Sequence, residues 1–257
     1  MTSHEWPVAF FDDDYLRIYS AMLSPAVTAR EVDFIESALA PPGGGEVLDV
    51  ACGNGRHAIG LARRGHRLTG VDFNPSYLEA AGKAALAAGV DVRWVAADMR
   101  ALPFDRAFDA AYSYFTSFGY FSDEENERVL AGVARALRRG GRFLLDVANR
   151  DWILTHPAQR IWTQLDDGSL LMEEIALDLR RSQVVNRQIH ITPQTGAQIT
   201  KQFTLRSYTC AELESLCARH GLAVREVWGG PDRSAYTTES RRLVLLAERG
   251  ERGERGG

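Results

Sequence analysis

The chain has 257 residues, of which 45% are hydrophobic, and its formal net charge at pH 7 is −4. This length is enough for one large domain with a substantial core, or for one domain with an insertion. The slightly acidic charge balance disfavours a nucleic-acid partner, because a dominant nucleic-acid surface is basic. No run approaches the roughly 20 apolar residues of a membrane span, and the N-terminal stretch lacks the basic and apolar regions of a signal peptide.

The three cysteines are Cys52, Cys210 and Cys217. The last two are seven residues apart (217 − 210) on a predicted helix, which separates them by roughly 10 Å at about 1.5 Å per residue. A disulfide requires Cα atoms within about 7 Å, so this pair cannot close. With no Cys-x-x-Cys metal pattern, the sequence predicts reduced thiols, no metal site and a cytoplasmic location.

The N-terminal region, residues 1–40, is predicted to be a helical cap. One or two helices cover 13–39, with a break near Pro25, and the loop PPGGG at 41–45 ends the cap. Strands and helices then alternate through 41–150. This alternation indicates an α/β fold with a doubly wound parallel sheet, whose ligand lies at the carboxyl ends of the strands.

The alternating region begins with predicted strands over 46–51, 67–72, 92–97, 108–114 and 142–148, and a first helix over 56–64. Asn74 can cap a second helix, which ends before Gly89. Ser122 and Glu125 form a capping box at the start of a third helix. Gly140 is predicted to end that helix.

The pattern changes after residue 150, where strand-like runs are separated by turn residues. These runs, with an Asp-Asp-Gly turn at 166–168, predict an antiparallel β insertion over 151–207. Residues 208–249 are predicted to supply a last helix and two strands, which complete a mostly parallel seven-stranded sheet. The charged, glycine-rich segment 250–257 is predicted to be a disordered tail.

The stretch LDVACGNGRH at 48–57 has the pattern of a buried strand, a glycine turn and the start of a helix. Its glycines fit the dinucleotide fingerprint, so their spacing alone does not decide which nucleotide binds. Asp49 distinguishes the candidates, because a carboxylate here opposes a pyrophosphate and suits the α-ammonium of S-adenosylmethionine. Gly53 and Gly55 let the backbone approach the ligand, and Ala51 belongs to the same turn.

Two further acids end the next two strands. Asp72 is predicted to accept hydrogen bonds from both ribose hydroxyls, as acids at that strand end do. Asp98 is placed to accept from the adenine amino group, while the Met99 backbone N–H donates to a ring nitrogen. Phe73 and Met99 are predicted to flank the adenine. Three acids at successive strand ends are more specific than the glycines alone, whereas Trp94 is interpreted as a core residue.

The segments VLDVACGNGRHAIGLARRGHRLTGVDFNPSYLEAA and AADMRALPF resemble the class I S-adenosylmethionine-dependent methyltransferases, which have a Rossmann-like fold. The resemblance covers roughly residues 46–148 and the C-terminal strand pair. DMRALPF followed by YSYFTSFGYF is similar to small-molecule N-methyltransferases of the amino-sugar and glycine type. This similarity implies S-adenosyl-L-methionine as cofactor, S-adenosyl-L-homocysteine as product, and an insertion that shapes the pocket of a small-molecule acceptor.

Candidate residues on the acceptor side come from two aromatic segments. After the fourth strand, Tyr114 and Phe115 are assigned to the cofactor and Tyr120 to the acceptor. In the cap, Tyr15 and Tyr19 lie four residues apart on one helix face. The resemblance implies that this cap folds over the cofactor, with Tyr19 in the cofactor site and Tyr15, like Tyr120, in a catalytic position.

The chemistry of the acceptor stays open at this stage. An amine that binds in its neutral form needs little help from a base, whereas a hydroxyl or carbon nucleophile needs a proton acceptor. The residues at 113–116 lack the Asn-Pro-Pro-Tyr or Asp-Pro-Pro-Tyr motif of the enzymes that methylate base nitrogens. An RNA methyltransferase, a cofactor-binding regulatory protein without transfer activity and an NAD-dependent oxidoreductase remain as alternatives, and the sequence is compatible with a homo-oligomer.

Overall fold

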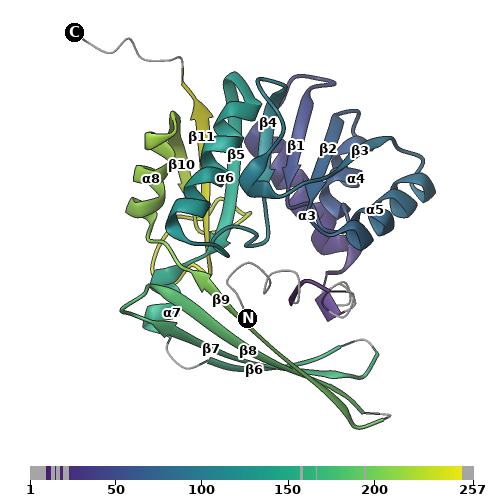
Figure 1. Cartoon of the computed structure of the whole chain (residues 1–257), viewed down its shortest axis with the longest axis vertical. Coiled ribbons are helices and arrows are strands. Elements are labelled where there is room, and N and C mark those ends of the chain that lie inside the picture. The colour runs from purple at the N-terminus through teal and green to yellow at the C-terminus, as the bar shows by residue number, and fades with distance from the viewer. Residues whose placement is uncertain are drawn as a thin grey trace.

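The structure is a computed structural model that describes residues 10–12, 15, 18–19, 23–156, 159–165, 167–193 and 195–250. An α/β core carries a separate, smaller β-sheet below it (Figure 1). The described N-terminal residues lie between the two parts. The predicted tail, apart from Gly250, lies outside the described residues.

The core sheet consists of seven strands: β1 (Glu46–Val50), β2 (Arg67–Asp72), β3 (Val92–Ala96), β4 (Phe108–Ser113), β5 (Leu137–Ala148), β10 (Leu222–Trp228) and β11 (Arg242–Arg249). Their order is β10-β11-β5-β4-β1-β2-β3. Strands β1 to β5 pair in parallel, and β11 pairs antiparallel with both β5 and β10. The predicted doubly wound, mostly parallel sheet is confirmed, and its order reverses between β1 and β4, where ligands of such sheets bind.

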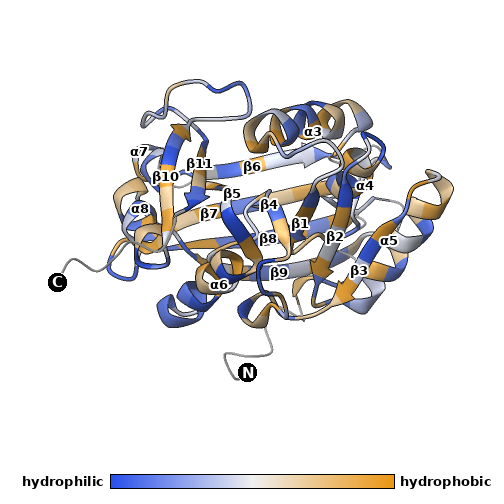
Figure 2. Ribbon diagram, turned by 90° about the horizontal axis from the view of Figure 1, so that it is seen from above, coloured by the Kyte–Doolittle hydropathy of each residue, from blue (hydrophilic) through white to orange (hydrophobic). Residues whose placement is uncertain are grey.

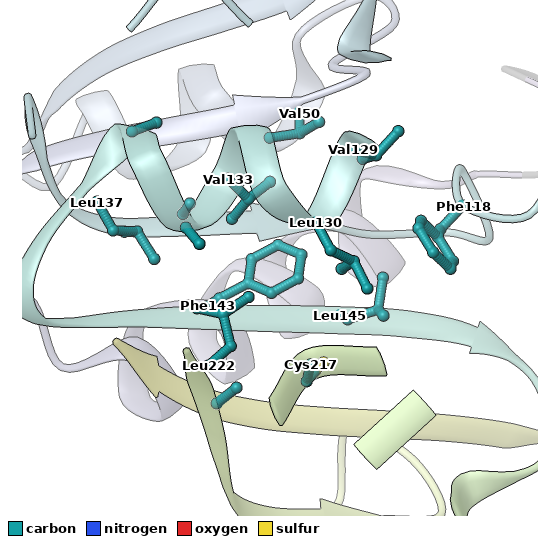
Figure 3. Packing of buried hydrophobic residues seen from close by; sticks show 14 of the residues in the cluster. Val50, Phe118, Val129, Leu130, Val133, Leu137, Phe143, Leu145, Cys217 and Leu222 are labelled. Carbon is teal, nitrogen blue, oxygen red and sulfur yellow. The ribbon is translucent and has the colours of Figure 1, made fainter. Parts of the chain in front are cut away.

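The helices are α3 (Pro25–Leu39), α4 (Arg56–Ala62), α5 (Pro75–Ala87), the short η1 (Met99–Ala101), α6 (Asp123–Ala136), α7 (Arg150–Thr155) and α8 (Cys210–Arg219). Helices α3 and α4 pack in one hydrophobic cluster with the sheet, and α6 and α8 pack in another. Figure 3 shows Leu130 and Val133 of α6 beside Phe143 and Leu145 of β5. Burying both faces of the sheet explains why its central strands are almost continuously apolar.

The second sheet contains β6 (Gln159–Gln164), β7 (Leu170–Asp178), β8 (Gln183–Thr192) and β9 (Ala197–Arg206), joined antiparallel in that order. Seen from above, its strands cross beneath the strands of the core sheet (Figure 2). At the first hairpin, the Gly168 N–H donates to the Leu165 carbonyl at 2.9 Å. The predicted antiparallel insertion is confirmed, although Asp166 of the predicted turn lies outside the described residues.

One predicted helix end is wrong. Helix α6 stops at Ala136, and the chain is already extended at Leu137 (φ −73°, ψ 148°), where β5 begins. Leu137 is fully buried and pairs with Phe108 of β4. Gly140 (φ +71°) instead lies at an irregular point in β5, because the register shifts before Ala110 pairs with Arg142. Pairing with a distant strand therefore outweighed the local helix-stop signal.

The sequence also did not predict α7, which Asn149 caps by accepting a hydrogen bond from the Asp151 N–H.

Among the described residues, no helix is both long enough and apolar enough to cross a membrane.

Gly53 and Gly55 form a matched pair for testing the glycine turn. Both have positive φ, +55° and +74°, but a Cβ at Gly55 would overlap the Trp94 ring, whereas one at Gly53 meets nothing within 4 Å. We expect Gly53→Ala to lower the free energy of unfolding by about 1–2 kcal/mol through strain. Gly55→Ala should lower the free energy of unfolding by about 1–3 kcal/mol more than Gly53→Ala does, because of overpacking. Urea denaturation measures both, and equal losses would show that the Trp94 contact is unimportant.

Candidate functional site

A cavity of about 320 Å³ opens at the carboxyl ends of β1, β2, β3 and β4. Its wall brings together almost every residue that the sequence singled out. These are Tyr15, Tyr19, Asp49, Ala51, Gly53, Asp72, Phe73, Asp98, Met99, Tyr114, Phe115 and Tyr120. Gly55 does not line the cavity. The absence of a side chain at Gly55 instead leaves room for the Trp94 ring.

Asp49, the penultimate residue of β1, is buried and lines the cavity. Its Oδ2 accepts a hydrogen bond of 2.8 Å from the Tyr112 hydroxyl. Burial raises the pKa of Asp49 to about 7, although the Tyr112 hydrogen bond and the charge of Arg56 oppose the rise. A cation bound beside this carboxylate would favour its ionised form.

Asp72 ties the glycine turn to the end of β2. One carboxylate oxygen accepts from the Gly53 N–H at 2.8 Å, and the other accepts from the Asn74 N–H at 2.9 Å. Burial raises the pKa of Asp72, while these backbone hydrogen bonds lower it. Each carboxylate oxygen can accept a second hydrogen bond, so the group keeps capacity for a ligand.

Asp98 is more exposed than the other two acids and is held by a neighbour that the sequence analysis did not consider. The Arg100 guanidinium donates to Asp98 Oδ2 at 2.6 Å and to Glu125 Oε1 at 2.5 Å. The Arg100 backbone N–H also donates to Asp98 at 2.8 Å. Arg100 lies over the Phe121 ring at 4.3 Å and lines the cavity. The spacing Asp-x-Arg was the only local signal for this pair.

Arg56 and His57, at the start of α4, also line the cavity. Glu31 of α3 accepts a hydrogen bond from Arg56 Nη1 and lies 3.1 Å from His57 Nε2. His57 is buried and packs edge-on against Tyr114, which favours a packing role, and burial lowers its pKa. Arg56 Nη2 is buried without a hydrogen-bond partner among the described residues.

The segment after β4 has a constrained backbone. Phe115 and Thr116 both have left-handed φ values, +67° and +57°. The buried Asp146 of β5 holds them, since its carboxylate accepts from the Phe115 N–H at 2.8 Å and its carbonyl from the Thr116 N–H at 3.1 Å. Asp146 is in turn paired with Arg242 of β11. Such strained, well-supported residues occur mainly at functional sites.

Another part of the cavity lining, here called the aromatic wall, consists of the rings of Phe11, Tyr15, Tyr19, Phe115 and Tyr120. Tyr15 and Tyr19 stack with ring centroids 4.2 Å apart, and Phe11 meets Tyr120 edge-on at 5.1 Å. Burial raises the pKa of all three phenols, so they are neutral at ordinary pH. Within this wall, Phe115 contacts Tyr19 with ring centroids 6.3 Å apart.

The groups that line the cavity suit S-adenosylmethionine in charge and in hydrogen-bonding capacity. The unpartnered donor on Arg56 suits the carboxylate of the methionyl group. Open space beside Gly53 leaves room for a ligand against the turn. The acids at three strand ends are hydrogen-bond acceptors, the kind of group that an ammonium, ribose hydroxyls and an amino group each require.

Comparison with known proteins agrees with this geometry. Residues 47–141 match the family model of a methyltransferase domain. A cypemycin N-terminal methyltransferase from Streptomyces is 30% identical over 93% of this chain and 97% of its own length.

Solved structures share the fold at lower identity. An S-adenosylmethionine-dependent methyltransferase from Clostridium acetobutylicum superimposes with a TM-score of 0.79 at 17% identity, covering 93% of this chain and 99% of that one. The sugar N-methyltransferase KedS8 from Streptoalloteichus gives a TM-score of 0.74 at 21% identity, with coverage of 92% and 93%. The matched domain and the Streptomyces relative show that the chain belongs to the methyltransferases.

Proposed function

We propose that this protein transfers a methyl group from S-adenosylmethionine to an amine nitrogen of a small molecule. The observation that carries the proposal is the aromatic wall of the cavity. Its ionisable groups are the phenols of Tyr15, Tyr19 and Tyr120, which burial keeps protonated. A neutral amine attacks without a base, whereas a hydroxyl needs one.

The same wall suits the cationic product of amine methylation. Aromatic faces attract alkylammonium groups, with a contribution of about 0.5–2 kcal/mol each. Phe11, Tyr15, Tyr19 and Tyr120 supply such rings from the N-terminal segment and from the loop after β4. Tyr15 and Tyr120 are therefore proposed to contact the acceptor.

The names of two similar proteins support a nitrogen acceptor. The Streptomyces relative is an N-terminal methyltransferase, and KedS8 is a sugar N-methyltransferase. Their acceptors differ from one another, so the proposal extends only to the amine group and not to the molecule that bears it.

We assign the methionyl end of the donor to the glycine turn and its neighbours. Asp49 would face the α-ammonium, and the free Nη2 of Arg56 would donate to the carboxylate. Tyr114 and Phe115 would enclose this end from β4, with Phe115 held in place by Asp146. S-adenosylmethionine supplies an activated methyl group, so these residues need only align it and exclude water.

The adenosine end is assigned to the next two strand ends. Asp72 would accept from the ribose hydroxyls with the lone pairs that Gly53 and Asn74 leave free. Asp98 would accept from the adenine amino group while it remains paired with Arg100. Phe73 and Met99 would pack on the adenine faces. Ala51 would complete the turn below the donor.

Transfer to a hydroxyl oxygen is the second candidate. His57 favours it, because a buried imidazole with a lowered pKa is neutral and can accept a proton. Its position against Glu31, 3.1 Å from Nε2, instead favours a structural role.

Matched pairs of amines and alcohols distinguish these candidates. We expect S-adenosylhomocysteine to form with primary amines but not with their hydroxyl counterparts. Below the pKa of the amine, the rate should rise about tenfold per pH unit as the neutral amine increases. Tyr15→Phe should keep most activity and Tyr15→Ala should lose it, because the ring and not the hydroxyl is needed. Methylation of alcohols alone would overturn the proposal.

A second test concerns Asp49, which should ionise when the donor ammonium binds. Calorimetry should show that S-adenosylhomocysteine binds more tightly as the pH rises through about 7, where the Asp49 carboxyl loses its proton. Asp49→Asn should weaken binding about tenfold or more at high pH, as expected for one charge-assisted hydrogen bond, and should remove the pH dependence. Asp98→Asn is the control, which should keep the pH dependence of the wild type. If Asp49→Asn also kept the wild-type pH dependence, the assignment would be contradicted.

The pKa of Asp49 also affects stability without ligand. An aspartate in the unfolded chain has a pKa of about 3.9, whereas that of folded Asp49 is about 7. The folded state holds this proton more tightly, so the contribution of Asp49 to stability falls as the pH rises from about 4 to about 7. Urea denaturation should therefore show that the free energy of unfolding of Asp49→Asn, relative to that of the wild type, increases from about pH 4 to about pH 7.

A further inference from the structure

Tyr19 connects the cavity to the inserted sheet. Its hydroxyl lies 2.6 Å from Nε2 of Gln188, a buried residue of β8. The same Nε2 lies 2.8 Å from Oε1 of Glu173 on β7, the direct cross-strand partner of Gln188. Asn186 Nδ2 donates to the same Glu173 oxygen at 3.0 Å. The hydroxyl, the amide and the carboxylate therefore form one chain of hydrogen bonds.

The direction of this chain follows from counting protons. A carboxylate only accepts hydrogen bonds, so Glu173 requires the NH₂ side of the Gln188 amide to face it. That NH₂ group has two protons, one for Glu173 and one for the Tyr19 oxygen. Tyr19 is therefore the acceptor in its contact with Gln188, and its own proton points elsewhere.

Tyr19 retains that proton. Burial raises its pKa, and the nearby charge of Glu173 raises it further. The ring is fixed by its stack on Tyr15 and its edge contact with Phe115. Tyr19 lines the cavity, and no described residue accepts its proton. A ligand in the cavity can accept it.

We propose that Gln188 and Glu173 are positioning residues that hold the Tyr19 hydroxyl as a hydrogen-bond donor to an oxygen atom of the bound ligand. The proposal rests on the proposed use of this cavity for donor and acceptor. Two ligands offer the required oxygen, namely the methionyl carboxylate of the donor and a hydroxyl or carbonyl beside the amine of the acceptor. The inserted sheet would then contribute to ligand recognition indirectly, because its residue Gln188 orients the Tyr19 hydroxyl.

Calorimetry with two nucleosides tests the proposal without a known acceptor. S-adenosylhomocysteine and 5′-methylthioadenosine share the thioadenosine part, but only the first has the amino-acid carboxylate. The full chain is compared with Gln188→Leu, Tyr19→Phe and the double variant. Asn186→Leu is the matched control, because it removes a contact of Glu173 but none of Tyr19. Tyr19→Phe removes one hydroxyl and keeps the test usable if Gln188→Leu does not fold.

If the donor carboxylate is the partner, Gln188→Leu and Tyr19→Phe should each weaken S-adenosylhomocysteine binding about tenfold and leave 5′-methylthioadenosine binding unchanged. The double variant should lose no more affinity than either single variant, because all three lose the same hydrogen bond from Tyr19 to the ligand. If the acceptor is the partner, both affinities stay unchanged and methylation falls only for amines that carry a neighbouring oxygen.

Three results would overturn the inference. One is unchanged binding and unchanged methylation in both single variants, and another is additive losses in the double variant. The third is an equal loss in Asn186→Leu, which would indicate a general structural effect. Wild-type protein that methylates only alcohols would instead contradict the proposed function, and would leave the Tyr19 result intact.

Discussion

The site depends on the hydrogen bonds that the Asp72 carboxylate accepts. These come from the Gly53 and Asn74 N–H groups, so Asp72 joins the turn after β1 to the start of α5. Without Asp72, these two backbone N–H groups would lose their hydrogen-bond acceptor, which is costly for buried backbone. In this turn Gly53 leaves open space on its side-chain face, and the buried Asp49 lines the cavity beside it. The position of one buried carboxylate thus shapes the surface on which the donor is proposed to bind.

The aromatic wall is built from parts of the chain that meet only in the folded protein. The N-terminal segment is held from the core, where Asn74 Nδ2 donates to the Phe11 carbonyl at 2.7 Å. It is held from the inserted sheet by an ion pair between Asp12 and Lys201, and by packing of Phe10 on Phe203. The segment therefore depends on both sheets for its place beside the cavity.

Buried charge is arranged differently at the two ends of the cavity. At the end proposed for the donor, Asp49 and Asp72 are buried in surroundings of low dielectric, where a bound cation would stabilise their ionised forms. At the end proposed for the acceptor, Tyr15, Tyr19 and Tyr120 are neutral phenols, and they lie beside a loop held by the Asp146–Arg242 pair. The cationic donor would bind beside the buried carboxylates, and the neutral amine would bind beside the uncharged phenols.

The sequence by itself determined the alternation of strands and helices and the place of each acid at a strand end. These features rest on local periodicity and on capping contacts such as Ser122 with Glu125, three residues apart, which the structure contains. Only the tertiary structure decided that Leu137 begins a strand, that Gly55 serves Trp94, and that Arg56 faces the cavity. It also decided the contact between Tyr19 and Gln188, which are 169 residues apart. Contacts over such separations leave no periodic trace in the sequence, because they depend on how complete elements pack.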